Sequence, residues 1–446
     1  MSLSAASDEM TMYRRPVELL QQLIRFDTTN PPGNEAACIG YISALLRAQG
    51  IEPLLLARDP ARPNLVARIA GEGTAPPLLL YGHVDVVTTA EQTWQHPPFA
   101  GVVAGGYVWG RGALDMKGGV AMLLASFLRA KAEGLHLPGD VVLVMLVDEE
   151  AGGDNGAQYL VEHHAGLFAD MRYALGEFGG FSMELGGRRF YPVQVAEKQI
   201  CWMRATVRGR AGHGSLPLRG GAMAKLGHLL RQLDRHRLPV HITPVARRMI
   251  ESITAALPMP GRVVLGQLLN PALTDGVLRL LGAGGTTFDP LLHNTVNATI
   301  VRGGDKINVI PSTITVDLDG RLLPGYRPEE MLSELRPLLG PEVELEVVRY
   351  DPGPPEPRLG LFDILAGIIR EADPEGIPIP FLLPGVTDGR FFSRLGIQTY
   401  GFLPMRLPGD LAFSRLIHAA DERIPVEAVG FGAEAVYRAL QTFGHA

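Results

Sequence analysis

Residues 78–87, LLLYGHVDVV, carry the strongest structural signal in this sequence. A short run of apolar, β-prone residues that ends in polar groups is typical of a buried parallel strand, whose carboxyl end opens into the crevice where α/β proteins place their chemistry. Here that end carries His83 and Asp85. Because side chains on a strand alternate, both are expected on one side, where the carboxylate can orient the imidazole. For this stretch alone, a hydrogen-bonded surface pair is the plain alternative.

Length and composition limit the classes of protein to consider. The chain has 446 residues, which favours two domains, each large enough to bury a sizeable core. Its formal net charge is −6 with both signs spread along the chain, and no basic run would follow a phosphate backbone, so nucleic acid is not an expected partner. The two cysteines, Cys38 and Cys201, lie far apart, which argues against a disulfide framework and a thiolate metal site.

Targeting signals are the next feature to consider. Residues 1–16, MSLSAASDEMTMYRRP, hold no apolar core of an export signal. No later segment is apolar and uncharged over a length that would cross a bilayer. We therefore expect a cytoplasmic protein in a reducing compartment, with no membrane among its partners.

Two further apolar runs, residues 140–147 and 171–176, also end in acidic side chains. The first run leads into three adjacent carboxylates, Asp148, Glu149 and Glu150. Carboxylates gathered at the end of a buried strand repel one another unless a cation neutralises them. The alternative is a solvated acidic turn that caps a following helix.

The second of these runs delivers Glu177 at its end. Elsewhere, the glycine-rich segment GRGALDMKGG places Asp115 in a loop that leads into a buried helix, where a carboxylate is well placed for an ion. Several predicted strands thus end in a histidine or an acidic residue, and one loop carries a further aspartate. Alternation of apolar and polar residues alone rarely produces this pattern.

The predicted fold class is α/β with an insertion. From about residue 197 several strands accompany two helices, which is typical of a compact α+β unit. We expect residues 1–196 and 353–446 to form a catalytic domain with a central, mostly parallel sheet flanked by helices, and residues 197–352 to form the inserted domain. Within the insertion we expect helices at residues 221–237 and 328–339, strands at residues 293–301, 306–311 and 313–318, and a stretch interrupted by proline and glycine from about 239 to 290.

Several motifs, in this order, resemble the M20 family of metallohydrolases: GHVDVV, GRGALDMKGG, VDEEAGG, a later glutamate, RAGHGSLP, and a histidine before DERIP. The resemblance covers nearly the whole chain. The family includes aminoacylases, succinyl-diaminopimelate desuccinylase, acetylornithine deacetylase and Gly-X carboxypeptidases. It implies a zinc-peptidase-type catalytic domain with an inserted lid or dimerisation domain. The long segment 239–290 resembles the Gly-X carboxypeptidase and long aminoacylase branch, where it would cover the substrate or remodel the dimer contact.

The resemblance also implies a co-catalytic centre with two Zn²⁺ per chain, for which Co²⁺ or Mn²⁺ are substitutes. The implied ligands are His83 and Glu177 for one ion, Glu150 and His418 for the other, and Asp115 between both. Glu184 and Asp170 stay open as substitutes for Glu177.

The same resemblance assigns catalytic roles beside the metals. Asp85 would hold His83, and Glu149 would be the general base that takes a proton from the attacking water and passes it to the leaving nitrogen. Adjacent residues at a strand end point in opposite senses, which would let Glu150 bind metal while Glu149 faces the substrate.

Three more residues are implied to contact the substrate. His213 resembles the family histidine that stabilises the tetrahedral oxyanion, in dimeric members within the partner's site, so a homodimer through the inserted domain is expected. A surface histidine in a glycine-rich turn is the alternative. Asn308 in INVIP and Arg390 in TDGRFF resemble positions that hold the substrate's free carboxylate.

The expected function is a di-zinc amidohydrolase that cleaves an N-acyl amino acid or short peptide next to a free carboxylate. Action like that of succinyl-diaminopimelate desuccinylase or acetylornithine deacetylase is the alternative within this class. A catalytically silent peptide- or metabolite-binding protein is a rival from another class, disfavoured by the intact Glu149 and ligand set. An oxidoreductase or transferase has no support, because no G-x-G-x-x-G or P-loop pattern follows a predicted strand.

Overall fold

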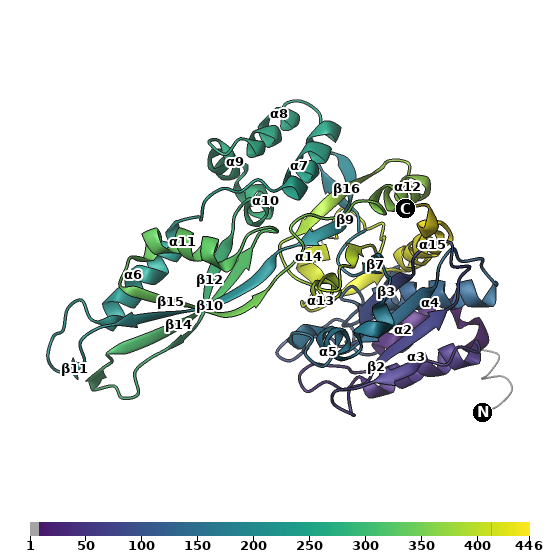
Figure 1. The fold of residues 1–446 in the computed structure, drawn as a ribbon, viewed down its shortest axis with the longest axis horizontal. Helices are drawn as coiled ribbons and strands as arrows, with labels where there is room; N and C mark the ends of the chain where they lie inside the picture. The colour runs from purple at the N-terminus through teal and green to yellow at the C-terminus, as the bar shows by residue number, and fades with distance from the viewer. Residues whose placement is uncertain (1–8, 412) are drawn as a thin grey trace. The chain divides into compact units, whose positions relative to one another are not determined.

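The computed structural model describes residues 9–411 and 413–446. The stretch in which no export signal is expected includes residues 1–8, which lie outside the described residues. The chain divides into two compact units, shown in Figure 1: unit 1 holds the chain up to Val195 with Arg358–Phe381 and Thr387–Ala446, and unit 2 holds Ala196–Pro357 and Leu382–Val386. No helix of the described part of the chain is long and apolar enough to span a membrane.

Among the described residues, unit 1 is built around a nine-stranded sheet. In spatial order its strands are β1 (Leu54–Leu56), β2 (Asn64–Ile69), β6 (Val141–Leu146), β3 (Leu78–His83), β7 (Tyr173–Gly176), β17 (Gln398–Gly401), β9 (Arg188–Glu197) and β16 (Gly376–Leu383), with β8 (Met183–Leu185) beside β9. The central strands β6, β3, β7 and β17 run parallel, and β1 and β2 pair antiparallel at one side. The predicted α/β fold class is confirmed.

Helices pack on both faces of this sheet (Figure 1). The α-helices of unit 1 are α2 (Pro16–Ile24), α3 (Ala36–Ala48), α4 (Lys117–Ala132), α5 (Ala157–His163), α12 (Phe362–Ala372), α13 (Gly389–Ser393), α14 (Phe413–Leu416) and α15 (Val426–Thr442). A small sheet joins β18 (Arg423–Pro425), β5 (Tyr107–Trp109) and β4 (Val102–Ala104). Strand β18 therefore brings the segment after His418 beside the segment before Asp115.

Strand β3 is buried along its whole length, as its apolar sequence predicts. On one face Leu79 and Tyr81 join a cluster with side chains of α5 and α13. On the other face Gly82 lies against α4, where an added Cβ would come within 2.6 Å of the Met116 side chain. Burial on both faces fixes β3 in position, so the residue at its carboxyl end is held rigidly.

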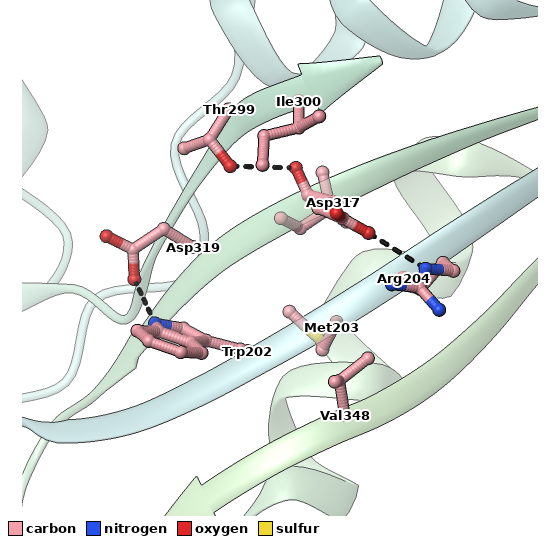
Figure 2. Close-up of a pocket in the computed structure, with 9 residues that line it drawn as sticks. Trp202, Met203, Arg204, Thr299, Ile300, Asp317, Asp319 and Val348 are labelled. Atoms are coloured by element: carbon pink, nitrogen blue, oxygen red, sulfur yellow. Dashed lines mark hydrogen bonds and ion pairs between the residues drawn. The ribbon is translucent and has the colours of Figure 1, made fainter. Parts of the chain in front are cut away.

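Unit 2 contains a four-stranded antiparallel sheet. In spatial order its strands are β12 (Thr295–Arg302), β14 (Thr313–Leu322), β10 (Gln199–Arg208) and β15 (Val343–Asp351), and its covering helices are α6 (Ala222–Arg235) and α11 (Pro328–Leu339). The helices lie on one face and share a core with alternate residues of β10, such as Met203 (Figure 1). The other face is open and holds a pocket of about 360 Å³, where Trp202 donates a hydrogen bond to Asp319 and Arg204 to Asp317 (Figure 2).

Two expectations for the insertion need correction. The strand expected at residues 306–311 is wrong in extent, because only β13 (Val309–Ile310) pairs, with β11 (Gly212–His213), and the residues before it form an exposed turn. The stretch interrupted by proline and glycine holds four helices that the sequence reading did not predict. They are α7 (Pro244–Ala256), α8 (Gly261–Gly266), α9 (Thr274–Leu281) and α10 (Gly285–Leu292). Pro244 begins α7 at its first position, where proline needs no N–H partner, so it starts a helix instead of interrupting one.

Lys198 is a buried lysine in unit 2 whose charge opposes folding at neutral pH. Its ammonium donates hydrogen bonds to the His293 carbonyl oxygen and to Thr295 Oγ1. Burial, reinforced by the charge of Arg321, lowers the pKa of Lys198 to about 7. Between about pH 7 and pH 10 the unfolded chain holds a proton there that the folded chain lacks, so the free energy of unfolding rises with pH across this window.

We predict that Lys198→Met makes the free energy of unfolding less dependent on pH between pH 7 and 9. Relative to the variant, the wild type should gain up to about 1 kcal/mol per pH unit, because its disfavoured charge is lost as the pH rises. Urea unfolding at several pH values measures this difference. Lys306→Met, at an exposed lysine of the same unit, is the matched control and should follow the wild type. The same pH dependence in all three proteins would contradict the lowered pKa.

Candidate active site

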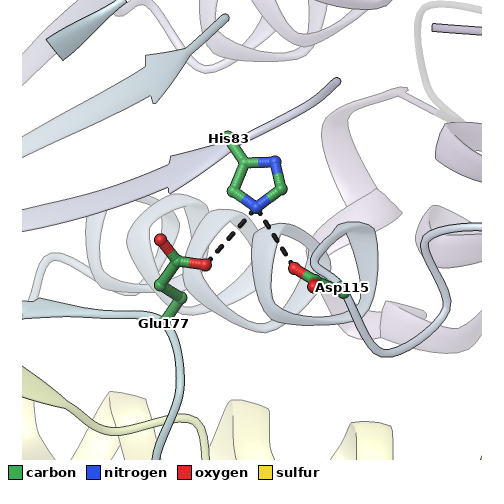
Figure 3. Close-up of side chains that lie close together, drawn as sticks. All are labelled: His83, Asp115 and Glu177. Atoms are coloured by element: carbon green, nitrogen blue, oxygen red, sulfur yellow. Dashed lines mark hydrogen bonds and ion pairs between the residues drawn. The ribbon is translucent and has the colours of Figure 1, made fainter. Parts of the chain in front are cut away.

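A first group of ligand-type side chains gathers at the carboxyl ends of β3 and β7 (Figure 3). His83 ends β3, and its Nε2 lies 3.3 Å from Asp115 Oδ1 and 3.4 Å from Glu177 Oε2. Glu177 directly follows β7, and Asp115 comes from the loop before α4. The three donor atoms lie within 4.8 Å of one another. Neither Glu184 nor Asp170 belongs to a ligand group among the described residues.

A second group uses the other oxygen of Asp115. Nε2 of His418 lies 3.3 Å from Asp115 Oδ2 and 3.3 Å from Glu150 Oε2. The other oxygen of Glu150 is buried and has no hydrogen-bond partner in the described part of the chain. Two groups of nitrogen and oxygen donors that share one carboxylate fit a pair of adjacent divalent cations. The residues present therefore suit two metal ions, for which Asp115 would supply one oxygen to each ligand group.

The electrostatics of both groups favour positive charge at their centres. Hydrogen bonds with Asp115 and Glu150 raise the pKa of His418 to about 10, against the effect of burial. Burial also disfavours the charged form of His83, yet hydrogen bonds with neighbouring carboxylates raise its pKa. The same histidines hold the pKa of Asp115 well below its usual range although it is buried. Carboxylates that hold two imidazoles in their charged form would equally attract divalent cations.

Asp85 supports the site in a way that the sequence reading did not anticipate. Strand β3 ends at His83, so Asp85 lies beyond it and the expected alternation does not apply. Nδ1 of His83 lies 3.0 Å from the backbone oxygen of Asp85 and 3.5 Å from its Oδ1. A proton on Nδ1 bonded to that carbonyl leaves Nε2 free to bind a metal ion. The Asp85 carboxylate itself accepts hydrogen bonds from the backbone N–H groups of Glu149, at 3.2 Å, and Glu150, at 3.1 Å.

Glu149 and Glu150 do not lie on a strand, so the alternation argument for their opposite directions is wrong. Strand β6 ends at Leu146, and both glutamates belong to the 3₁₀ turn Glu149–Ala151. Asp148, just before the turn, has a left-handed backbone with φ of 70°. The rotation of a helical turn, instead of strand alternation, separates the two side chains.

Glu149 has the electrostatic character of a proton carrier. Burial raises its pKa well above the ordinary value for glutamate, and the charge of Glu177 adds to the effect. A carboxyl whose pKa is raised toward the working pH can accept a proton in one step and return it in the next.

Three buried polar residues that support the segment of these glutamates, Arg62, Glu35 and Asn30, were not predicted from the sequence. Arg62 binds Glu35 with one terminal nitrogen and, at 2.8 Å, Asp148 with the other. Asn30 donates hydrogen bonds to both Asp148 and Asp85. Through Asp85, which accepts from the backbone N–H of Glu150, this network is connected to a candidate metal ligand. Arg62 lies 27 residues from Glu35 and 86 from Asp148, so no local spacing in the sequence links it to them.

Asp388 is a further buried carboxyl that was overlooked in TDGRFF. Its backbone N–H lies 3.4 Å from Glu177 Oε1, and neither of its side-chain oxygens has a hydrogen-bond partner among the described residues. Burial raises the pKa of Asp388 to about 8. A signal for it is present in the sequence, because Asp388 stands two positions before Arg390 in the same motif.

The three residues expected to contact substrate divide between the two units. His213 and Asn308 meet in unit 2, where Gly214 N donates to Asn308 O and both side chains are exposed beside the β11 and β13 pair. Arg390 is buried in α13 of unit 1, and its terminal nitrogens donate to the carbonyls of Thr387 and Gly152. Arg390 thereby supports the loop after Glu150. Contact of His213, Asn308 or Arg390 with the substrate stays a prediction.

A mixed sheet whose parallel central strands carry histidine and carboxylate groups at their carboxyl ends is typical of α/β metallohydrolases. Residues 79–442 match the peptidase family M20/M25/M40, so the chain belongs to this family. It is an enzyme, a hydrolase of the peptidase and aminoacylase type. The resemblance inferred from the motifs is therefore confirmed.

Two curated relatives show the range of the family. Aminoacylase-1 of Sus scrofa is 26% identical over 442 residues, which cover 95% of this chain and 94% of the relative. The N-fatty-acyl-amino acid synthase/hydrolase PM20D1 of Xenopus tropicalis is 30% identical over 368 residues, 79% of this chain and 70% of the relative.

Solved structures share the fold. The M20 family metallo-carboxypeptidase Sso-CP2 from Sulfolobus solfataricus superposes with a TM-score of 0.70 at 16% identity, covering 97% of this chain and 100% of that one. The YXEP protein of Bacillus subtilis, described as a dinuclear metal binding peptidase from the M20 family, gives a TM-score of 0.60 at 14% identity over 97% of this chain and 98% of that one.

We predict that Arg62→Met lowers the free energy of unfolding by about 3–5 kcal/mol, because it leaves the carboxylates of Glu35 and Asp148 buried without their cation. Arg68→Met is the matched control, since the pair of Arg68 with Asp140 is partly exposed and its loss should cost about 1 kcal/mol or less. Urea unfolding of both variants measures the difference. Equal losses would show that burial does not distinguish the two arginines.

Proposed function

We propose that the chain is a di-zinc amidohydrolase that cleaves the amide bond of an N-acyl amino acid or short peptide next to a free carboxylate. The observation that carries the proposal is the sharing of Asp115 between two ligand groups, with Glu149 on the turn beside them. The names of the aligned aminoacylase and fatty-acyl-amino acid hydrolase support an acyl amino acid substrate. Co²⁺ or Mn²⁺ would substitute for Zn²⁺ at nitrogen and oxygen donors.

The metal pair, when bound, would polarise the amide carbonyl and make a water molecule more acidic. His83 and Glu177 would hold one ion, Glu150 and His418 the other, and Asp115 both. The chain supplies the proton transfers: the Glu149 carboxylate would take a proton from the attacking water and deliver it to the leaving nitrogen. Asp85 would fix the turn that carries Glu149, through the backbone N–H bonds described above.

Unit 2 would contribute contacts to the substrate. His213 would stabilise the oxyanion, and Asn308 would hold the free carboxylate together with Arg390. In a homodimer formed through unit 2, His213 would serve the partner's site. Leu216 and Ile307, on the loops that carry His213 and Asn308, are exposed apolar side chains that such a dimer contact would cover.

We predict that Glu149→Gln retains its metal and loses activity about 10²–10⁴-fold or more, because the amide cannot accept the proton. The measurements are metal content per chain and the rate of hydrolysis of the best substrate. Glu162→Gln, at an exposed glutamate of α5, is the control and should keep both. Near-normal turnover of Glu149→Gln with full metal content would contradict the proposed role.

The substrate is identified with a panel of N-acetyl, N-succinyl and long-chain N-acyl amino acids beside dipeptides, before and after removal of metal by a chelator. We predict chelator-sensitive hydrolysis that zinc restores, since the ligand set suits that ion. Preference for acyl amino acids would select an acylase, and preference for dipeptides a peptidase. Metal binding without hydrolysis across the panel would favour the silent binding protein.

Mixing two inactive variants tests the role of the partner subunit. His213→Ala and Glu149→Gln should each be inactive alone, and the heterodimer should combine an intact Glu149 with the partner's intact histidine at one of its two sites. After exchange of subunits we predict recovery of about one quarter of the wild-type activity, as random pairing in a two-fold dimer gives. If His213 acts within its own chain, mixing will restore nothing.

A further inference from the structure

Gln92 joins the two loops that carry Asp115 and His418. Its Nε2 donates a hydrogen bond of 2.9 Å to the backbone oxygen of His418. Its Oε1 accepts from Arg111 Nη2 at 2.8 Å and from Trp94 Nε1 at 3.2 Å. Two N–H donors on one side and a carbonyl acceptor on the other leave only one orientation for this amide. Both the N–H and the oxygen of the Gln92 amide therefore have hydrogen-bond partners.

Arg111 continues the connection to Glu422. Nη1 of Arg111 lies 2.6 Å from Glu422 Oε2, and the side chains of both residues are buried. Glu422 also accepts hydrogen bonds from the backbone N–H groups of Gly112, Leu114 and Asp115. One carboxylate thus holds the loop that presents Asp115, and its own segment directly follows His418. A continuous chain of hydrogen bonds therefore connects His418 with Asp115. We call its three side chains, Gln92, Arg111 and Glu422, the loop clamp.

His418 needs such support more than the other ligands do. His83 and Glu177 stand at the ends of buried central strands, whereas His418 lies on a loop with its side chain half exposed. Its backbone has φ of 60°, and Asp421 on the same loop has φ of 61°. Left-handed backbone is unfavourable for residues other than glycine and persists only where surrounding contacts impose it. The bond from Gln92 is one of these contacts.

We propose that Gln92 is a positioning residue of the metal centre, which sets the place of His418 relative to Asp115 through the loop clamp. It reaches the centre through the backbone of His418 and through Arg111, and touches no ligand side chain in the bonds described. Its effect should fall on the group of Asp115, Glu150 and His418, and spare the group that includes His83 and Glu177. This inference rests on one part of the proposed function, namely that each of the two ligand groups binds a metal ion.

Two substitutions separate the bonds of Gln92. Gln92→Ala removes all of them. Gln92→Glu keeps an acceptor for Arg111 and Trp94, but its second oxygen cannot donate to the His418 carbonyl and repels it. Gln158→Ala is the matched control, because Gln158 lies on α5 and its side chain bonds only to an exposed glutamate in the interactions described.

The first measurement is calorimetric titration of the metal-free chain with Zn²⁺ in competition with a chelator. We expect two binding events in the wild type and in Gln158→Ala. In both Gln92 variants one event should weaken about 10–100-fold and the other should not change, as for loss of a residue that supports a ligand. Two unchanged events, or equal weakening of both, would overturn the inference.

The second measurement does not depend on metal. Amide hydrogen exchange of the metal-free chain should be faster over residues 413–425 in both Gln92 variants, and unchanged around residues 78–83 and 173–177. Unchanged exchange at residues 413–425 would overturn the role of Gln92. If the wild type takes up no zinc, the proposed function fails, and the exchange measurement still decides whether Gln92 positions His418.

Discussion

Mutual repulsion among closely spaced carboxylates is the constraint on which the site depends. Asp115, Glu150 and Glu177 all point into one small space at the edge of a parallel sheet, with two histidines between them. Such a concentration of negative charge is stable only with compensating positive charge. The neighbouring carboxylates raise the pKa of both His83 and His418, so protonated imidazoles would compensate this charge, and divalent cations would also do so. The buried strands and the ion pairs behind them hold the carboxylates in place against this repulsion.

The structure brings the candidate ligands together, and most of them follow a local signal in the sequence, whereas His418 was expected only from the resemblance to the family. His83 and Glu177 end apolar runs, and the acidic residues after residue 147 end another. Parallel strands align their carboxyl ends, so local patterns were enough to place these residues at one edge. Asp115 was predicted from the glycines around it, which allow the backbone to approach the strands closely.

The sequence did not predict how those ligands are held. The direction of Glu149 and Glu150 was expected from strand alternation, but a left-handed residue before them starts a 3₁₀ turn. Some side chains that support the site bind partners remote in sequence, as Arg62, Glu422 and Gln92 do. The spacing of residues along the chain does not predict such contacts. In unit 2 the helices between residues 244 and 292 were missed because proline was taken as an interruption, although it also begins helices.

The half-exposed side chain of His418 makes the two candidate ligand groups unequal toward solvent, because His83 in the other group is buried. His83 would hold an ion with a buried side chain, whereas His418 would hold one with a side chain that is half exposed. Exchange with free metal would then be slow at the inner position and fast at the outer one. The enzyme would retain one ion as a lasting part of its fold and acquire the other from its surroundings. Its working fraction would consequently follow metal supply as well as the amount of protein made.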